Sequence, residues 1–284
     1  MSTPTVRRRR LGAKLRALRG ELTLKEVTEQ SKGRFAYSKL SRIETARSAP
    51  KMQDIGALLD LYANLGREVS SELRAALMML AKEDDQRGWW HSYRGVISPV
   101  YEDLISLEAE AHSVSVWHLG AIPGLLQTGD YARELIRVLA LTEVPVDALV
   151  QVRLARQMVL TREEPLTLRA IVAEQALRST SSVDGLMHEQ LGRLLAMGKR
   201  PNVSIQVVPA NAALHVGQLE SFSVLHFGPH TDLDVVHAEG LTSALYIEER
   251  EQVAAYRDAS QQLASVALPA EESAQLIASI RKDA

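Results

Sequence analysis

Residues 22–50, LTLKEVTEQSKGRFAYSKLSRIETARSAP, decide how the amino-terminal part of the chain folds. Two short helical patterns lie on either side of a loop that contains Gly33. The first pattern opens with a T-x-x-E sequence, in which the side chains of Thr23 and Glu26 can each accept a hydrogen bond from a free amide at the start of a helix. We therefore predict a helix from about Thr23, a turn, and a second helix, which is the layout of a helix-turn-helix.

The second helical pattern carries few apolar side chains. Leu40 and Ile43 are three residues apart and share one face of a helix. The other faces carry short hydroxyls and two cations, at Ser38, Lys39, Ser41 and Arg42. Such a surface can enter the major groove of DNA and donate to guanine or phosphate. The alternative is an ordinary solvated helix face.

The sequence S-K-L-S-R-I-E-T, followed by Arg47 and Pro50, resembles the recognition helix and exit turn of Xre-type, lambda-repressor-like bacterial regulators. The resemblance covers about residues 11–65. It implies that Glu44 braces the second helix. It also implies that four positions face DNA: Ser38, Lys39, Ser41 and Arg42.

Three residues depart from the pattern of that family. Ala36 and Tyr37 stand where a hydroxyl cap and a small residue or proline are usual, and Ala46 replaces a usual glycine. An alanine at the cap position costs about 1 kcal/mol of helix stability. The helix is therefore expected to start elsewhere or to be capped by another group, and Ala46 leaves the shape of the exit turn open.

Length and charge both indicate two domains. A chain of 284 residues exceeds one average domain of about 150 residues. Residues 1–66 hold 14 Lys and Arg against 6 Asp and Glu, a net charge of +8, while the remainder carries −10. The basic part suits contacts with phosphates, whose affinity falls steeply with salt. The acidic part is expected to stay off DNA.

Several classes of protein are excluded by composition. The absence of cysteine rules out disulfides, a thiolate nucleophile and Cys-ligated zinc. No run of about 18 apolar residues is present, and residues 6–10 lead into an amphipathic helix rather than an apolar signal sequence. We therefore expect a cytoplasmic protein without a membrane partner.

The DNA-binding domain is expected to span residues 1–83. It should contain the two helices of the motif, one helix before them and two after them. The first covers about residues 7–19, with Gly20 as its C-cap, and its apolar face should meet Val27, Leu40 and Ile43. Arg7 to Arg10 are either a phosphate-gripping arm or the charged first turn of this helix. Amphipathic helices at about 51–65 and 69–83 either close the core or pair with a second copy.

A connector at residues 84–99 breaks the helical periodicity. It contains Trp89, Trp90 and Tyr93, which are too apolar to leave in water. We expect them to pack on the second domain or on a dimer mate, with stacking on a ligand as the alternative.

Residues 100–284 are expected to form an α+β domain with a mostly antiparallel sheet. The strands are predicted at about 113–118, 166–173, 203–208, 221–227, 233–238 and 243–246, and helices at about 101–111, 129–141, 145–160, 183–197, 248–265 and 269–282. Leu125, Leu126 and Tyr131 are assigned to the core. The long loop at 209–218, which contains Leu214 to Gly217, is a candidate binding surface.

The second domain also resembles a known family. The motifs are L-E-A-E-A, I-P-G-L-L-Q-T-x-D-Y-A-R, R-x-x-R-Q, P-N-V-S-I-Q-V-V-P and E-G-L-T-S-A-L-Y. They are similar to the C-terminal domain of unknown function that follows the helix-turn-helix in a large group of Xre-type, antitoxin-like regulators. The resemblance implies a transcriptional regulator, often considered with a small partner protein, and brings no catalytic residues.

An enzymatic second domain is the weaker hypothesis. His226, His230 and His237 cluster with Asp232 and Asp234, but their spacing matches no zinc motif, so we interpret them as surface loop residues. Ser221, Ser223 and Thr242 lack a nucleophile elbow. Neither common nucleotide-binding glycine motif occurs, and Gly217, Gly228 and Gly240 are interpreted as turn glycines. We expect no catalytic residue, metal or cofactor.

The sequence thus favours a regulator that binds double-stranded DNA as a homodimer on two half-sites about one helical turn apart. Ser38, Lys39, Ser41 and Arg42 would approach bases, and Arg34 and Arg47, with some of Arg7 to Arg10, would hold phosphates. The second domain would dimerise and respond to a protein or small ligand. The competing hypothesis is an antitoxin-like protein that binds a small partner protein and regulates its own operon.

Overall fold

The computed structural model describes residues 5–81, 88–228, 233–241 and 243–284. The chain divides into two compact units, Met1–Trp89 and Trp90–Ala284. Of the predicted connector, residues 84–99, the part from Trp90 onward belongs to the second unit.

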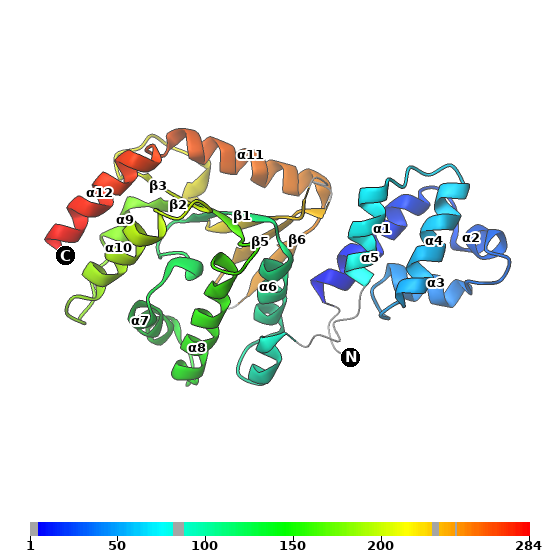
Figure 1. Ribbon diagram of the computed structural model, residues 1–284, viewed down its shortest axis with the longest axis horizontal. Coiled ribbons are helices and arrows are strands. Elements are labelled where there is room, and N and C mark those ends of the chain that lie inside the picture. Colours follow the sequence, from blue (N-terminus) through cyan, green and yellow to red (C-terminus); the bar gives the residue numbers. More distant parts are fainter. Residues whose placement is uncertain (1–4, 82–87, 229–232, 242) are drawn as a thin grey trace. The chain divides into compact units, whose positions relative to one another are not determined.

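The first unit is helical in its described part (Figure 1). Its helices are α1 (Val6–Arg19), α2 (Leu24–Gln30), α3 (Tyr37–Glu44), α4 (Met52–Asn64) and α5 (Ser71–Ala81). Helix α1 packs on α3 and α5, and α2 packs on α3. The apolar faces expected from the sequence form the core, with buried side chains at Leu11, Leu15, Val27, Leu40, Ile43, Ile55, Leu58, Leu59, Leu73, Leu77 and Leu80.

The predicted helix boundaries of this unit are confirmed at the caps. Thr23 and Glu26 form a complete capping box at the start of α2. Gly20 is the C-cap of α1, with a φ of 61°, and its amide donates to the carbonyls of Arg16 and Ala17. Each cap satisfies backbone groups that a helix end leaves free.

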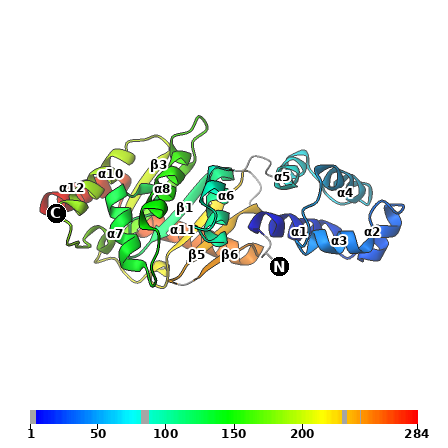
Figure 2. The same ribbon diagram turned by 90° about the horizontal axis from the view of Figure 1, so that it is seen from below.

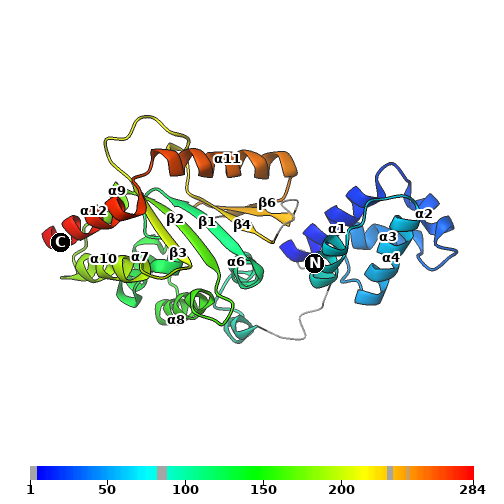
Figure 3. The same ribbon diagram turned by 45° about the horizontal axis from the view of Figure 1, so that its top comes forward.

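The second unit is a six-stranded sheet covered by helices. The strands are β1 (Ser113–His118), β2 (Thr167–Ala173), β3 (Val203–Val208), β4 (Phe222–His226), β5 (Val235–Glu239) and β6 (Ala244–Ile247). Its helices are α6 (Pro99–Glu110), α7 (Gly129–Leu139), α8 (Val146–Arg156), α9 (Glu174–Leu177), α10 (Leu186–Met197), α11 (Arg250–Val266) and α12 (Ala270–Asp283). Figure 3 shows α11 on one face of the sheet and α6, α7, α8 and α10 on the other, and Figure 2 is viewed from the side of the latter group.

The sheet is mixed, so the expectation of a mostly antiparallel sheet was wrong. The strand order is β3-β2-β1-β4-β5-β6. Strands β1, β2 and β3 run parallel, whereas β4, β5 and β6 are antiparallel to their neighbours. The reason is the order of elements along the chain. Helices α7 and α8 connect β1 to β2, and α9 and α10 connect β2 to β3. Connections of this kind return the chain to the same end of the sheet and make the strands parallel.

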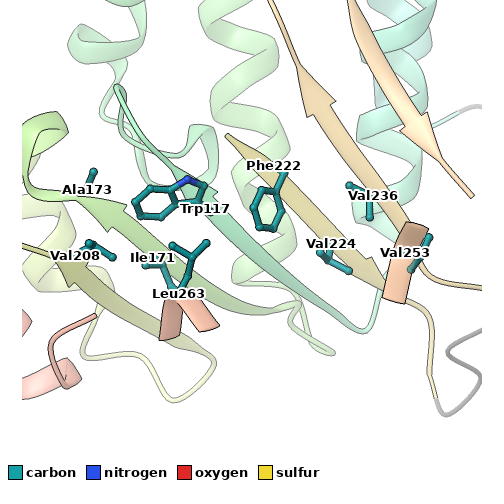
Figure 4. Close-up of a cluster of buried hydrophobic side chains, with 9 residues drawn as sticks. All are labelled: Trp117, Ile171, Ala173, Val208, Phe222, Val224, Val236, Val253 and Leu263. Atoms are coloured by element: carbon teal, nitrogen blue, oxygen red, sulfur yellow. The ribbon is translucent and has the colours of Figure 1, made fainter. Parts of the chain in front are cut away.

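The main apolar core lies between the sheet and α11 (Figure 4). Trp117, Ile171, Phe222 and Val224 project from the strands toward Val253 and Leu263 of α11. The loop before β4 closes the end of this core, because the indole nitrogen of Trp117 donates to the carbonyl oxygen of Gly217 at 2.8 Å. A Cβ atom at Gly217 would lie 2.6 Å from the Trp117 ring, so only glycine fits.

A second cluster holds the aromatic residues of the predicted connector. Trp90 and Tyr93 pack against Ile97, Ile105 and Val152, which confirms that these two side chains contact the second domain. Trp89 is 38% exposed. Next to this cluster, the carboxylate of Glu108 accepts two hydrogen bonds from the guanidinium of Arg156, which is also bonded to the Tyr101 hydroxyl at 3.1 Å.

Candidate nucleic-acid interface

Helix α3 presents a polar surface because only two of its side chains are needed for the core. Leu40 and Ile43 are buried, and the cap residue Ala36 makes no side-chain hydrogen bond. The expectation of a shifted start or of another capping group was wrong, because α3 begins at Tyr37 directly after Ala36 and without a side-chain cap. Its position is set by packing on α1 and α2 rather than by a hydroxyl cap.

The exit turn of α3 keeps the geometry of a glycine C-cap although it contains alanine. The amide of Arg47 donates to the carbonyl of Arg42 at 2.8 Å, and the amide of Ala46 donates to that of Ile43 at 3.0 Å. These two bonds define a Schellman motif. Ala46 accordingly has a left-handed φ of 56°, which is unfavourable for a residue with a Cβ atom.

The carboxyl end of α3 is tied to α1. The guanidinium of Arg19 donates to both carboxylate oxygens of Glu44, at 2.8 and 3.0 Å, and the two side chains are 14% and 5% exposed. This bidentate pair bears out the bracing role expected for Glu44. The hydrogen bond to Glu44 is the main cause that raises the pKa of Arg19, so the guanidinium stays charged.

A close backbone approach fixes the same two helices. A Cβ atom on Gly12 of α1 would lie 2.6 Å from the carbonyl oxygen of Glu44 and 2.7 Å from that of Ile43. Glycine therefore lets α1 touch the backbone of α3 directly. Together with the Arg19–Glu44 pair, it holds the exposed side of α3 in one orientation.

Most of the residues predicted to contact DNA lie at the surface. Ser38 and Arg42 are exposed on α3, Ser41 is half-buried, and Arg34 and Arg47 are exposed beyond its two ends. The set lies within one short segment of the chain, and three of its side chains carry a positive charge.

Lys39 has a different environment from the others. Its ammonium group pairs with Asp54 in the first turn of α4 at 2.8 Å and lies 5.4 Å from the centre of the Phe35 ring. A lysine held in this way links α3 to α4. Its charge is partly neutralised, so it is less suited than Arg42 to read a base.

Two of the four arginines at the start of α1 contribute to the fold. Arg7 donates from Nε to the carbonyl of Leu80 at 3.1 Å and from Nη2 to that of Met79, which caps the last turn of α5. Arg10 is only 4% exposed. All four lie in the first turns of α1, as the second of the two alternatives expected. Arg8 is exposed and Arg9 half-buried, so a role in holding phosphates stays a prediction for these two residues.

One surface residue of α3 was not singled out from the sequence as a contact. Tyr37 is 59% exposed in the first turn of the helix, although its spacing of three from Leu40 is typical of a core position. The one feature of the sequence that could have indicated exposure is the position of Tyr37 beside Ser38 in a helix with few apolar residues. Helical periodicity alone predicts that Tyr37 is buried.

The cluster of histidine and aspartate in the second unit does not lie in a surface loop as expected. Asp234 and His237 are buried, at 3% and 6% exposure. His226 hydrogen-bonds to Asp234, with Nδ1 2.8 Å from Oδ2, while His237 packs its ring against Tyr246. His230 and Asp232 lie outside the described residues.

Burial and nearby charge explain the electrostatics of His237. Desolvation is the largest effect, and the charge of Arg156 adds to it. Together they lower the pKa of His237 to about 4. His118 has a pKa lowered to about 4 by the same two causes.

The remaining sequence candidates in the second unit have structural roles. Leu125, Leu126 and Tyr131 are buried, which confirms their assignment to the core. The Ser221 hydroxyl accepts a hydrogen bond from the Leu119 amide at 3.0 Å, and Thr242 lies outside the described residues. Within the ranges that the structure describes, no three His, Asp or Glu side chains are placed to hold a metal ion.

The loop at residues 209–218 combines an anchored and an exposed part. Gly217 is fixed by Trp117, and His215 packs edge-on against the same indole. Leu214 and, just after the loop, Leu219 are 89% and 92% exposed. Apolar side chains of this size are typical of a surface that contacts another molecule where they lie together in one patch.

Among the described residues, no helix is both long and apolar enough to span a bilayer. The searches of curated proteins and of solved structures returned no match. Residues 101–279 match a protein family described as "Domain of unknown function (DUF5753)". Since this match covers more than half of the chain and nearly all of the second unit, the protein belongs to the DUF5753 family.

Proposed function

We propose that this protein is a sequence-specific, double-stranded DNA-binding transcriptional regulator that acts as a homodimer. The observation that carries the proposal is the surface of α3. Arg42 and Ser38 project from a helix whose other side is fixed by Gly12 and the Arg19–Glu44 pair. A rigid helix with short polar side chains fits the major groove.

The roles within the interface follow from the placement of each side chain. Arg42 has the length and planar donors to bind guanine through two hydrogen bonds, and Ser38 and Ser41 are short enough to let the helix approach the bases. Arg34 and Arg47, beyond the two ends of α3, would bind phosphates and fix the position of the helix along the duplex. Lys39 would add to the positive potential from its place beside Asp54.

A second feature supports binding to DNA rather than to a neutral partner. The charge of residues 1–66 is +8, although the whole chain carries −2. The positive charge of the first unit attracts the phosphates of DNA, and the negative charge of the remainder repels them, so only the first unit would bind DNA. The proposed location of such a protein is the cytoplasm, where it meets bacterial DNA.

The experiment that tests the proposal is selection of bound duplexes from a random pool by the full-length protein at about 0.15 M salt. A regulator of this kind enriches one sequence, with two half-sites separated by about one helical turn. Recovery of unrelated sequences at the same salt, with no common element after repeated rounds, contradicts the proposal.

A second candidate function is that of an antitoxin-like protein that binds a small partner protein. The exposed Leu214 and Leu219, on a loop anchored by Trp117, favour this candidate. Co-purification from the native host followed by mass measurement separates the two. A stoichiometric small protein that is lost from the Leu214→Ser/Leu219→Ser variant supports the second candidate, and a dimer of this chain alone supports the first.

A further inference from the structure

The face of the sheet under α11 has an apolar half and a polar half. The apolar half is the core of Figure 4. In the other half, Ser115 of β1 is the register partner of Arg169 of β2, which is the register partner of Ser204 of β3. Strands β1 and β2 lie inside the sheet, whereas β3 forms its edge. Central strands covered on both faces normally carry apolar residues, so the polar Ser115 and Arg169 on β1 and β2 require an explanation.

These residues line a pocket of about 270 Å³. Strands β1 to β3 contribute Ser115, Arg169, Ser204 and Gln206, and α11 contributes Ser260 and Ala264. This volume is just below the range of roughly 300–1,000 Å³ that is usual for pockets that hold drug-sized ligands, so the pocket has room only for a smaller molecule.

The charge of the pocket comes from Arg169. Its side chain is exposed, and it forms no hydrogen bond or ion pair with another described residue. In contrast, Arg156 and Arg133 of the same unit are paired with Glu108 and with Asp130 and Asp147. A guanidinium binds carboxylate or phosphate through two parallel hydrogen bonds, which water or a neutral group cannot reproduce.

Hydroxyl groups around Arg169 complete a site for an anion. Ser204 and Ser260 form no side-chain hydrogen bonds within the described part of the chain, so both hydroxyls are available as donors. The Ser115 hydroxyl is 3.5 Å from Nε2 of His226, whose Nδ1 is held by Asp234. Gln206 donates to the Leu268 carbonyl at 3.0 Å, which leaves its side-chain oxygen as an acceptor for a donor group on the ligand.

The carboxylate of Asp234, which holds His226 beside Ser115, does not cancel this positive charge. Asp234 accepts hydrogen bonds from His226 and from the amide of Phe227, and its Oδ2 is 3.9 Å from the guanidinium of Arg257. Its side chain is only 1% exposed and does not line the pocket. The charge that faces the cavity is therefore that of Arg169.

Ser115, His226 and Asp234 are linked by hydrogen bonds in the same order as a serine nucleophile, its base and the supporting carboxylate. The position of Ser115 in the sheet nevertheless favours binding over catalysis. Strand β1 lies between β2 and β4, so its amides near Ser115 belong to the sheet ladder. They are not available to stabilise the oxyanion that acyl transfer produces.

We propose that this pocket binds a small molecule that carries a carboxylate or phosphate group, with Arg169 pairing to the anion and Ser115, Ser204 and Ser260 hydrogen-bonding to it. That such a molecule acts as an effector of DNA binding rests on the function proposed above. The binding of the anion to the pocket does not depend on that function.

The test is a titration of the full-length protein, without DNA, with inorganic phosphate and with malonate at constant ionic strength, followed by NMR of the amides of residues 115, 169 and 204. The variant is Arg169→Gln, and the control is Arg137→Gln, which removes an exposed arginine of α7. Thermal melts of the three proteins establish that each is folded.

The proposal predicts saturable shifts at these amides with at least one of the two anions. Loss of the charge-assisted pair should weaken binding by about tenfold or more in Arg169→Gln, and Arg137→Gln should bind like the natural protein. Shifts that do not saturate with either anion, or equal affinity in Arg169→Gln, overturn it.

The same variants separate this inference from the proposed function. Without added anion, Arg169→Gln should bind a selected duplex as tightly as the natural protein. A titration without saturable shifts therefore contradicts only the anion-binding proposal. Failure to select a duplex contradicts only the DNA-binding proposal.

Discussion

The backbone of α3 depends on the absence of a side chain at Gly12. A methyl group there would contact two carbonyl oxygens of α3 at 2.6–2.7 Å, and these backbone atoms cannot move without separating α1 from α3. We expect Gly12→Ala to lower the free energy of unfolding of the first unit by about 1–3 kcal/mol. Hydrogen exchange of the α3 amides measures the loss.

Gly56→Ala is the matched control for that substitution. Its added Cβ would be 3.8 Å from the Met78 side chain, which is ordinary contact, and alanine is the better helix former by up to about 1 kcal/mol. Gly56→Ala should slightly increase the protection of the α3 amides from hydrogen exchange. Equal protection in the two variants would contradict the close approach at Gly12.

Ala46 offers a prediction in the opposite direction. Its left-handed conformation costs about 1–2 kcal/mol, and loss of its buried methyl group costs about 0.8 kcal/mol. Ala46→Gly should therefore stabilise the first unit by about 0.5–1 kcal/mol in urea denaturation. Ala13→Gly, in the exposed middle of α1, should destabilise it by about 1 kcal/mol. A loss of stability in Ala46→Gly would show that the strain is absent.

At the scale of elements, the link between α1 and α3 is an ion pair with little exposure. Glu44→Ala leaves the guanidinium of Arg19 without its partner, and we expect a loss of about 2–4 kcal/mol in thermal or urea unfolding. Asp60→Ala removes the partner of Arg74 in a more exposed pair and should cost less than about 1 kcal/mol. Similar losses in both variants would mean that the Arg19–Glu44 pair is no stronger than a surface contact.

The sequence was sufficient for most elements of the first unit, because its signals are local. The capping box at Thr23, the C-cap at Gly20 and the apolar faces of α1 and α4 each lie within a few residues. The pairing of Lys39 with Asp54 and the exposure of Tyr37 depend on how helices pack, so periodicity did not reveal them.

In the second unit, strands were found more reliably than their directions. β1 and β3 match their predicted bounds, Ser113–His118 and Val203–Val208, but the parallel arrangement was missed. The alternation of strand and helix up to β3 is typical of parallel pairing and was outweighed by the three closely spaced strands that follow. The burial of Asp234 and His237 depends on the covering elements, which spacing along the chain does not encode.

At the scale of the whole molecule, buried histidines make stability depend on pH. The pKa of His237 is about 4 in the folded protein and about 6.5 in the unfolded chain, so the unfolded chain binds more protons between these values. The second unit should be at full stability above pH about 6.5 and lose roughly 2–3 kcal/mol from this group as pH falls to about 4.

Replacement of the histidine checks that assignment. His237→Phe keeps a ring beside Tyr246 and removes one of the two buried titrating groups, so it should reduce the pH dependence of the melting temperature over this range and leave the part due to His118. His112→Phe, at an exposed position, serves as control and should leave the slope unchanged. An unaltered slope in His237→Phe would assign the effect to other groups.

The central claim concerns the whole chain as a reader of DNA, and the most direct measurement is the affinity of Arg42→Ala for a selected duplex. Fluorescence anisotropy at fixed salt compares that duplex with a scrambled one, and Arg137→Ala is the control. Arg42→Ala should weaken binding to the selected duplex by about 1–3 kcal/mol, change binding to the scrambled duplex much less, and thus reduce discrimination. Unchanged discrimination in Arg42→Ala would contradict the assignment of α3 as the helix that reads the bases.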